Sequence, residues 1–206
     1  MLLLLLAGCS FRPSMRPYDE KGLTGTTSAP TSLKALARVE LARDIKGRAT
    51  VLVKSPDKIR IEVYGPMNRI VAVVAGDSED CTLYYRGRLS GCRWDDPALA
   101  GPAGPRELVP ILLGTGGAVF GDKKGWTTTT DRDGNPAEIV RLGSPELRIS
   151  MGDYRTVMGA KIPFIFVIEN GTKKLNIRYY SVVLNPRLDG DTFSLFLPDY
   201  GEEIGP

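Results

Sequence analysis

Three cysteines, Cys9, Cys81 and Cys92, are the side chains best suited to chemistry in this chain, because histidine is absent. Without histidine the chain lacks the commonest general base near neutral pH and the commonest zinc ligand. No Gly-x-Ser-x-Gly motif is present, so a serine nucleophile would lack both its usual turn and its usual base. We therefore expect no enzyme, no cofactor and no metal centre, and we expect the cysteines to serve attachment and cross-linking.

Cys9 follows residues 2–8, an apolar run that closes with Leu-Ala-Gly. The pattern resembles the bacterial lipobox, in which a signal peptide is cut before a cysteine that then carries lipid on its thiol. On this interpretation residues 1–8 are a signal peptide, shorter than usual and without a leading basic residue, so we expect the true start to lie upstream. An ordinary apolar N-terminus with a stray cysteine is the alternative. The run is too short for a spanning helix, which needs about 20 apolar residues.

Residues 9–30 are rich in Ser, Thr, Gly and Pro and show no sustained periodicity, which is typical of a flexible tether. About 20 residues of such chain reach on the order of 25 Å. A lipid on Cys9 would therefore hold the following domain near a membrane and leave it free to tilt. Ser10, directly after the cysteine, resembles the outer-membrane pattern of enterobacterial lipoproteins. We expect a lipid-anchored protein of the outer membrane that faces the periplasm.

Cys81 and Cys92 flank a predicted hairpin whose two-residue turn is Arg86-Gly87. Strands over residues 81–85 and 88–92 would place the two cysteines directly opposite each other, with Cα atoms about 4.5–5.5 Å apart, inside the disulfide range. Disulfides are expected in the oxidising compartment that a lipid anchor implies. We expect a Cys81–Cys92 disulfide, and two buried free thiols are the alternative.

The 206-residue chain is 42% hydrophobic and 25% charged, which is ordinary for a globular domain with a sizeable core. Its 27 basic and 24 acidic residues are interspersed, giving a net charge of +3 and no basic run of the kind that binds nucleic acid. We expect one monomeric domain over residues 31–200 and no nucleic-acid partner.

Alternation of apolar and polar residues predicts β-strands over most of this domain. In the clearest pair, Ile59, Ile61 and Val63 alternate with polar neighbours, Gly65-Pro66-Met67-Asn68 forms a turn, and residues 70–75 return as an apolar strand. Met67 is a large apolar side chain at the tip, where turn chemistry favours a small polar residue. It is therefore a candidate functional residue.

Helices are predicted at two places. Ser32 is expected to cap a short helix through Leu36, before strands begin at Arg38. A second helix is expected to begin at Pro105, to be kinked or split by Pro110, and to end at Gly114. A helix this short and broken is unlikely to stand alone, so we expect it to lie over an apolar surface of the sheet.

Several weak motifs occur in a persuasive order: residues 56–61, Gly65-Pro66-Met67, a helical segment over residues 107–114, Ile162-Pro163 at a strand start, the turn Asn170-Gly171, and a long strand from Lys173. In this order they resemble the LolA/LolB lipoprotein-localisation superfamily, LolB-like outer-membrane lipoproteins in particular. The resemblance spans residues 38–183. It implies a mainly β fold with short helices: an unclosed antiparallel β-barrel of about eleven strands, with a helical lid over an apolar cavity. The number of strands agrees with the strands predicted above.

The resemblance also implies a function. The chain would bind acyl chains of other lipoproteins, take them from a LolA-like periplasmic carrier and help deliver them to the outer membrane. The family has an exposed leucine on the loop after its third strand, thought to help delivery, and the matching position here is Met67, next to Pro66. A structural or interaction lipoprotein of a cell-envelope complex, with the same fold as a scaffold, is the alternative function.

An acyl chain gains roughly 0.8 kcal/mol per buried methylene, so such a cavity needs apolar walls and no specific polar site. A closed core made of the same side chains is the alternative to a cavity. The side chains that we expect to line it are apolar and come from several predicted strands and the second helix: Val51, Val53, Ile59, Ile61, Val63, Ile111, Leu112, Ile149, Phe164, Phe166, Ile177 and Tyr179.

Overall fold

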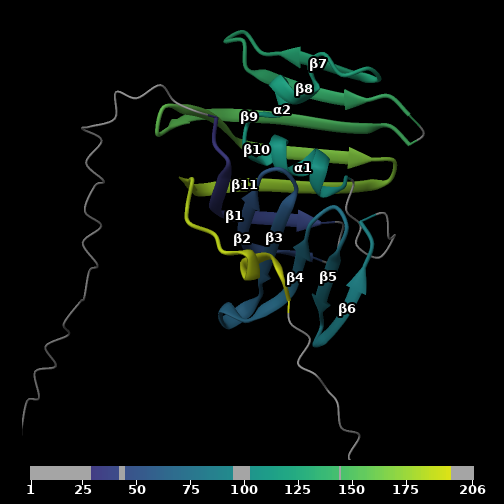
Figure 1. Ribbon diagram of the computed structural model, residues 1–206, viewed down its shortest axis with the longest axis vertical. Coiled ribbons are helices and arrows are strands. Elements are labelled where there is room, and N and C mark those ends of the chain that lie inside the picture. The colour runs from purple at the N-terminus through teal and green to yellow at the C-terminus, as the bar shows by residue number, and fades with distance from the viewer. Residues whose placement is uncertain (1–28, 42–44, 95–102, 144, 196–206) are drawn as a thin grey trace, which may run out of the picture.

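A computed structural model describes residues 29–41, 45–94, 103–143 and 145–195, in which eleven strands form one antiparallel sheet that does not close (Figure 1). Cys9, the predicted signal peptide and residues 10–28 of the predicted tether lie outside the described residues. The strands are β1 Ser32–Leu41, β2 Ile45–Lys54, β3 Lys58–Tyr64, β4 Ile70–Gly76, β5 Cys81–Tyr85, β6 Arg88–Cys92, β7 Trp126–Thr130, β8 Pro136–Arg141, β9 Leu147–Val157, β10 Ala160–Asn170 and β11 Lys173–Leu184.

The sheet consists of two meanders, β1 to β6 and β7 to β11, joined by the pairing of β1 with β11. β6 and β7 are the two free edges, and the chain passes between them through α1, Pro105–Leu112, and α2, Gly116–Phe120. The prediction of a mainly β, unclosed antiparallel sheet of about eleven strands with short helices is therefore confirmed.

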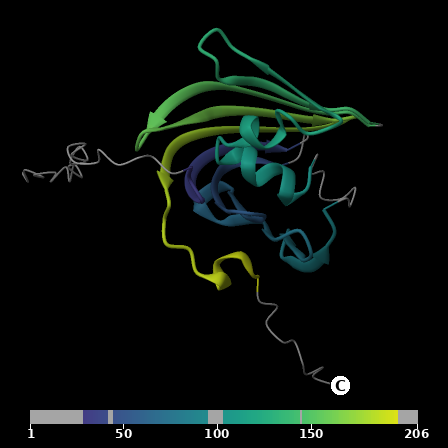
Figure 2. The ribbon, with the colours of Figure 1, turned by 45° about the horizontal axis from the view of Figure 1, so that its top comes forward.

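The two helices lie inside the curve of the sheet (Figure 2). Pro105 stands at the first turn of α1, where a missing N–H costs nothing, and Gly114, with a φ of 77°, follows the end of the helix. α1 continues past Pro110, whose carbonyl accepts hydrogen bonds from the Thr115 N–H (2.8 Å) and hydroxyl (3.1 Å). The helix expected from Pro105 to Gly114 is therefore present and covers the concave face, but it is not split at Pro110. The second helix, α2, follows Gly114 and was not predicted. No helix in the described part of the chain is long and apolar enough to cross a membrane.

The expected helix from Ser32 to Leu36 is wrong, because these residues begin β1. Leu33, Ala35 and Ala37 are buried and alternate with the exposed residues Lys34, Leu36 and Arg38. Alanine has a high intrinsic helix propensity, but a strand buries these three side chains on one face of the sheet, and tertiary burial outweighs so weak a local preference.

The opposite, convex face is partly covered by residues 185–195, which include a 3-10 turn, η3, at Gly190–Phe193. The Phe193 side chain is buried, and the Arg60 guanidinium donates a hydrogen bond to the Thr192 carbonyl (3.1 Å). The Lys54 amine donates to the Leu188 carbonyl (3.0 Å). Residues 185–195 therefore pack on the face of the sheet opposite to α1 and α2.

Cys81 and Cys92 are directly opposed on β5 and β6 and are joined by a disulfide, with Cα atoms 4.9 Å apart. The Arg86-Gly87 turn between these strands has positive φ at both residues, as a two-residue hairpin turn requires. The disulfide therefore staples the hairpin that forms one free edge of the sheet.

We predict that replacing both cysteines, Cys81→Ala with Cys92→Ala, lowers the free energy of unfolding by about 3 kcal/mol, the loop-closure entropy of a cross-link over this short span. Urea unfolding of the double variant and of the parent protein measures the change. Reduction of the parent protein should give a loss of similar size. Equal midpoints for the oxidised parent and the double variant would contradict the prediction.

Candidate functional site

All twelve side chains predicted to line an acyl cavity lie in one apolar cluster between the concave face of the sheet and the helices. They come from β2 and β3 in one meander, from β9, β10 and β11 in the other, and from α1, and none is more than 8% exposed. The buried polar residues of the described part are Ser32, Thr50 and Asn135, none of which is charged. No ionised group is fully buried in the described part of the apolar cluster, and the cations that touch it, such as Arg155 over the Phe164 ring, are partly exposed.

Aromatic rings fill the middle of the cluster. Phe166 and Tyr179 meet edge to face with ring centroids 5.1 Å apart, and Phe164 approaches Tyr179 at 6.1 Å. The Tyr179 hydroxyl donates a long hydrogen bond, 3.5 Å, to the Leu112 carbonyl at the end of α1. Burial raises the pKa of Tyr179, so the phenol is neutral at any physiological pH. In the structure, the three aromatic side chains pack on one another beneath the helices.

Polar contacts hold the first turn of α1 to both meanders. Glu107 forms an ion pair with Arg141 of β8, and their side chains are 19% and 36% exposed. On the other side, the Arg106 guanidinium donates to the Ser78 hydroxyl (3.1 Å) and lies 3.7 Å from the Asp57 carboxylate. Arg106 is 75% exposed, so its contacts contribute little, whereas the half-buried Glu107–Arg141 pair is the stronger latch.

α2 is fixed by ring stacking. Phe120 of α2 stacks on Trp126 of β7, with centroids 4.2 Å apart and planes inclined by 20°. Arg141 also lies over the Trp126 ring, at 5.8 Å. α1 and α2 therefore rest on different supports: α1 on aliphatic contacts with one ion pair, and α2 on an aromatic stack at the edge of the sheet.

We predict that Glu107→Gln loosens α1 without unfolding the sheet. Amide hydrogen exchange in α1 should become at least about five-fold faster, the effect of about 1 kcal/mol from a lost charge-assisted contact. Glu146→Gln is the matched control, because Glu146 pairs with Arg148 on the exposed surface, where both side chains are 44% exposed. Equal exchange rates of α1 amides in the two variants would contradict the role of Glu107.

Met67 lies at the tip of the β3–β4 hairpin, inside a 3-10 turn, η1, at Pro66–Asn68. Its side chain is 82% exposed, the largest fraction among the large hydrophobic residues of the described part. Both Met67 and Asn68 have positive φ, 56° and 60°, a conformation that is uncommon for residues other than glycine. Arg48 donates a hydrogen bond to the Asn68 amide oxygen (3.2 Å), which helps hold this turn.

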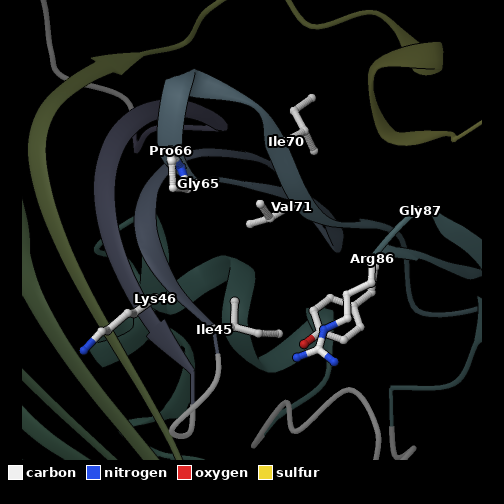
Figure 3. Close-up of a pocket in the computed structure, with 9 residues that line it drawn as sticks. Ile45, Lys46, Gly65, Pro66, Ile70, Val71, Arg86 and Gly87 are labelled. Atoms are coloured by element: carbon white, nitrogen blue, oxygen red, sulfur yellow. The ribbon is translucent and has the colours of Figure 1, made fainter.

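A pocket beside this tip did not follow from the sequence pattern (Figure 3). It has a volume of about 390 Å³ and lies where the start of β2, the β3–β4 tip and the β5–β6 turn meet. We call it the tip pocket. Its lining residues are Ile45, Lys46, Gly65, Pro66, Ile70, Val71, Tyr85, Arg86 and Gly87.

No group of three or more Cys, Asp or Glu side chains in the described part could hold a metal ion. The apolar cluster beneath the helices can bury an apolar ligand. The tip pocket offers both cationic and apolar side chains to a ligand.

No protein-family model and no curated protein matches the sequence. Among solved structures, the chain is similar to a domain from Vibrio parahaemolyticus provisionally described as an outer membrane lipoprotein-sorting protein domain. The TM-score is 0.50 at 11% identity, over 79% of this chain and 88% of that domain.

Two further structures are more distant. A LolA superfamily protein from Nitrosomonas europaea has a TM-score of 0.48 at 12% identity, over 80% of this chain and 89% of that one. LprF from Mycobacterium bovis has a TM-score of 0.32 at 14% identity, over 80% and 90%. At such identities a likeness concerns the fold alone. The chain shares its fold with the Vibrio domain.

Proposed function

We propose that this chain is a lipid-anchored, periplasm-facing protein of the outer membrane that binds acyl chains of other lipoproteins beneath α1 and helps deliver them to the membrane. The observation that carries the proposal is the cover of the concave face. An apolar face made by both meanders is closed by two helices of 8 and 5 residues. An acyl chain can replace the aliphatic contacts of α1, with the Glu107–Arg141 pair opening as the helix moves.

The energies support reversible exchange. Burying the apolar side chains of α1, Leu108, Val109, Ile111 and Leu112, stabilises the closed state by roughly 6–12 kcal/mol at 1.5–3 kcal/mol each. An acyl chain with about 14 methylenes gains about 11 kcal/mol on burial. Because the two amounts are similar, a chain can displace α1 and leave again, as a carrier requires.

Delivery would use the anchor and the exposed tip together. A lipid on Cys9 would keep the domain at the membrane, and Met67 would present an apolar, flexible side chain to it. A LolA-like periplasmic carrier is the proposed donor of the cargo. The fold shared with the Vibrio domain, whose description concerns lipoprotein sorting, supports this assignment. The proposal is non-enzymatic and needs no cofactor.

The alternative is a structural or interaction lipoprotein of a cell-envelope complex. Two observations favour it: the cluster beneath the helices is filled by the protein's own side chains, and β6 and β7 each have one unpaired edge. In this case, loss of the protein should disturb its complex while other lipoproteins still reach the outer membrane.

We predict that the full chain with Cys9→Ser, which cannot carry lipid, binds a fluorescent fatty acid saturably and releases it to unlabelled palmitate. Glu107→Gln in the same background should raise the association rate, because α1 opens more often, and Glu146→Gln should not. Fluorescence titration and stopped-flow mixing measure both. A folded protein that shows no saturable binding would establish the closed core and favour the alternative function.

We predict that Met67→Glu leaves folding and fatty-acid binding unchanged and impairs transfer of a labelled lipoprotein from a carrier to membranes that bear this protein. Met158→Glu is a matched control, because Met158 is also an exposed methionine with positive φ, 47°, at the tip of the β9–β10 hairpin. Normal transfer by Met67→Glu, or equal impairment by both variants, would contradict a specific role of Met67 in delivery and leave it a residue of the turn alone.

A further inference from the structure

Two cations that are far apart in the sequence line the tip pocket. Lys46 follows the start of β2, and Arg86 lies in the β5–β6 turn. In Figure 3 they lie on opposite sides of Ile45, with the Arg86 guanidinium directed toward Ile45 and the Lys46 ammonium directed away from both. None of the residues that line the pocket is acidic. The pocket is therefore a positively charged recess at the same tip as Met67.

Neither cation is neutralised within the described part of the chain. Lys46 and Arg86 take part in no ion pair or side-chain hydrogen bond there, in contrast to Arg48, which donates to Asn68. The Arg86 guanidinium lies over the Tyr85 ring, 5.0 Å from its centroid, a contact that leaves the N–H donors at its edge available. Arg86 also adopts a positive φ, 51°, in the turn that presents it.

Much of the remaining lining is apolar and half-exposed. Ile45, Pro66, Ile70 and Val71 line the recess, and Ile70 is 42% exposed. A small hydrated anion gains nothing from such walls, whereas a phosphodiester joined to glycerol and acyl chains fits both the cations and the apolar surface. The combination of unpaired cations with apolar walls thus points to a lipid headgroup.

We propose that the tip pocket binds the phosphate headgroup of an anionic phospholipid in the membrane, with Arg86 as the phosphate-binding side chain and Lys46 as a second cation that is attracted to the anionic surface around it. The inference rests on the proposed function for its location at a membrane, and it adds the lipid class and the residues that recognise it. Binding there would orient the tethered domain with the β3–β4 tip toward the bilayer, and Met67 would lie next to the occupied pocket.

The test uses the full chain with Cys9→Ser and sedimentation with vesicles of phosphatidylcholine, with or without phosphatidylglycerol. The parent should prefer the vesicles that contain phosphatidylglycerol. Lys46→Gln with Arg86→Gln should weaken this binding about 25-fold, since each cation near an anionic surface contributes about five-fold. Lys124→Gln with Arg132→Gln removes the same charge from exposed positions before β7 and in the β7–β8 turn, and should leave binding within about two-fold of the parent.

Three outcomes would overturn the inference: no preference of the parent for phosphatidylglycerol, equal weakening by the two double variants, or release from the vesicles by inorganic phosphate at the lipid phosphate concentration. The last outcome would identify a free-phosphate site. Fatty-acid binding and lipoprotein transfer, measured on the same proteins, separate this inference from the proposed function. Charge-dependent vesicle binding without acyl binding would refute the carrier function and leave the lipid site intact.

Discussion

Burial of the concave apolar face against α1 is the interaction on which the rest of the structure depends. A sheet of eleven strands that curves without closing leaves one apolar face that water would otherwise reach. Leu108, Val109, Ile111 and Leu112 of α1 are at most 4% exposed, and they cover β2 and β3. α1 in turn depends on this contact, because an isolated helix of 8 residues with an internal proline is not stable in water.

This mutual dependence links the fold to the proposed function. A cover held by aliphatic contacts and one half-buried ion pair can be exchanged for another apolar chain at little net cost in free energy. The pairing of β1 with β11 joins the two meanders into one sheet through contacts that do not involve α1. In the proposed function, membrane contact belongs to a separate part of the molecule, the β3–β4 tip, so cargo binding and docking would be open to separate alteration.

Alternation and turn chemistry predicted most strands, the Arg86-Gly87 turn and the residues that meet under α1, because strand parity decides which side chains share a face. Local propensity failed at the start of β1, where Ala35 and Ala37 belong to a buried face. The tip pocket was not predictable, since the start of β2 and the β5–β6 turn come together only through the pairing of β2 to β5. Strand parity also does not reveal whether side chains on one face leave space between them.

The central claim is that α1 gives way to an acyl chain. The most direct measurement is hydrogen exchange in α1 of the folded Cys9→Ser chain during titration with palmitate. We expect exchange in α1 to change with a single saturation curve, in step with displacement of the fluorescent fatty acid, while exchange in β1 and β11 stays constant. Exchange in α1 that does not respond to palmitate, in a protein that remains folded, would show that the concave face is a closed core.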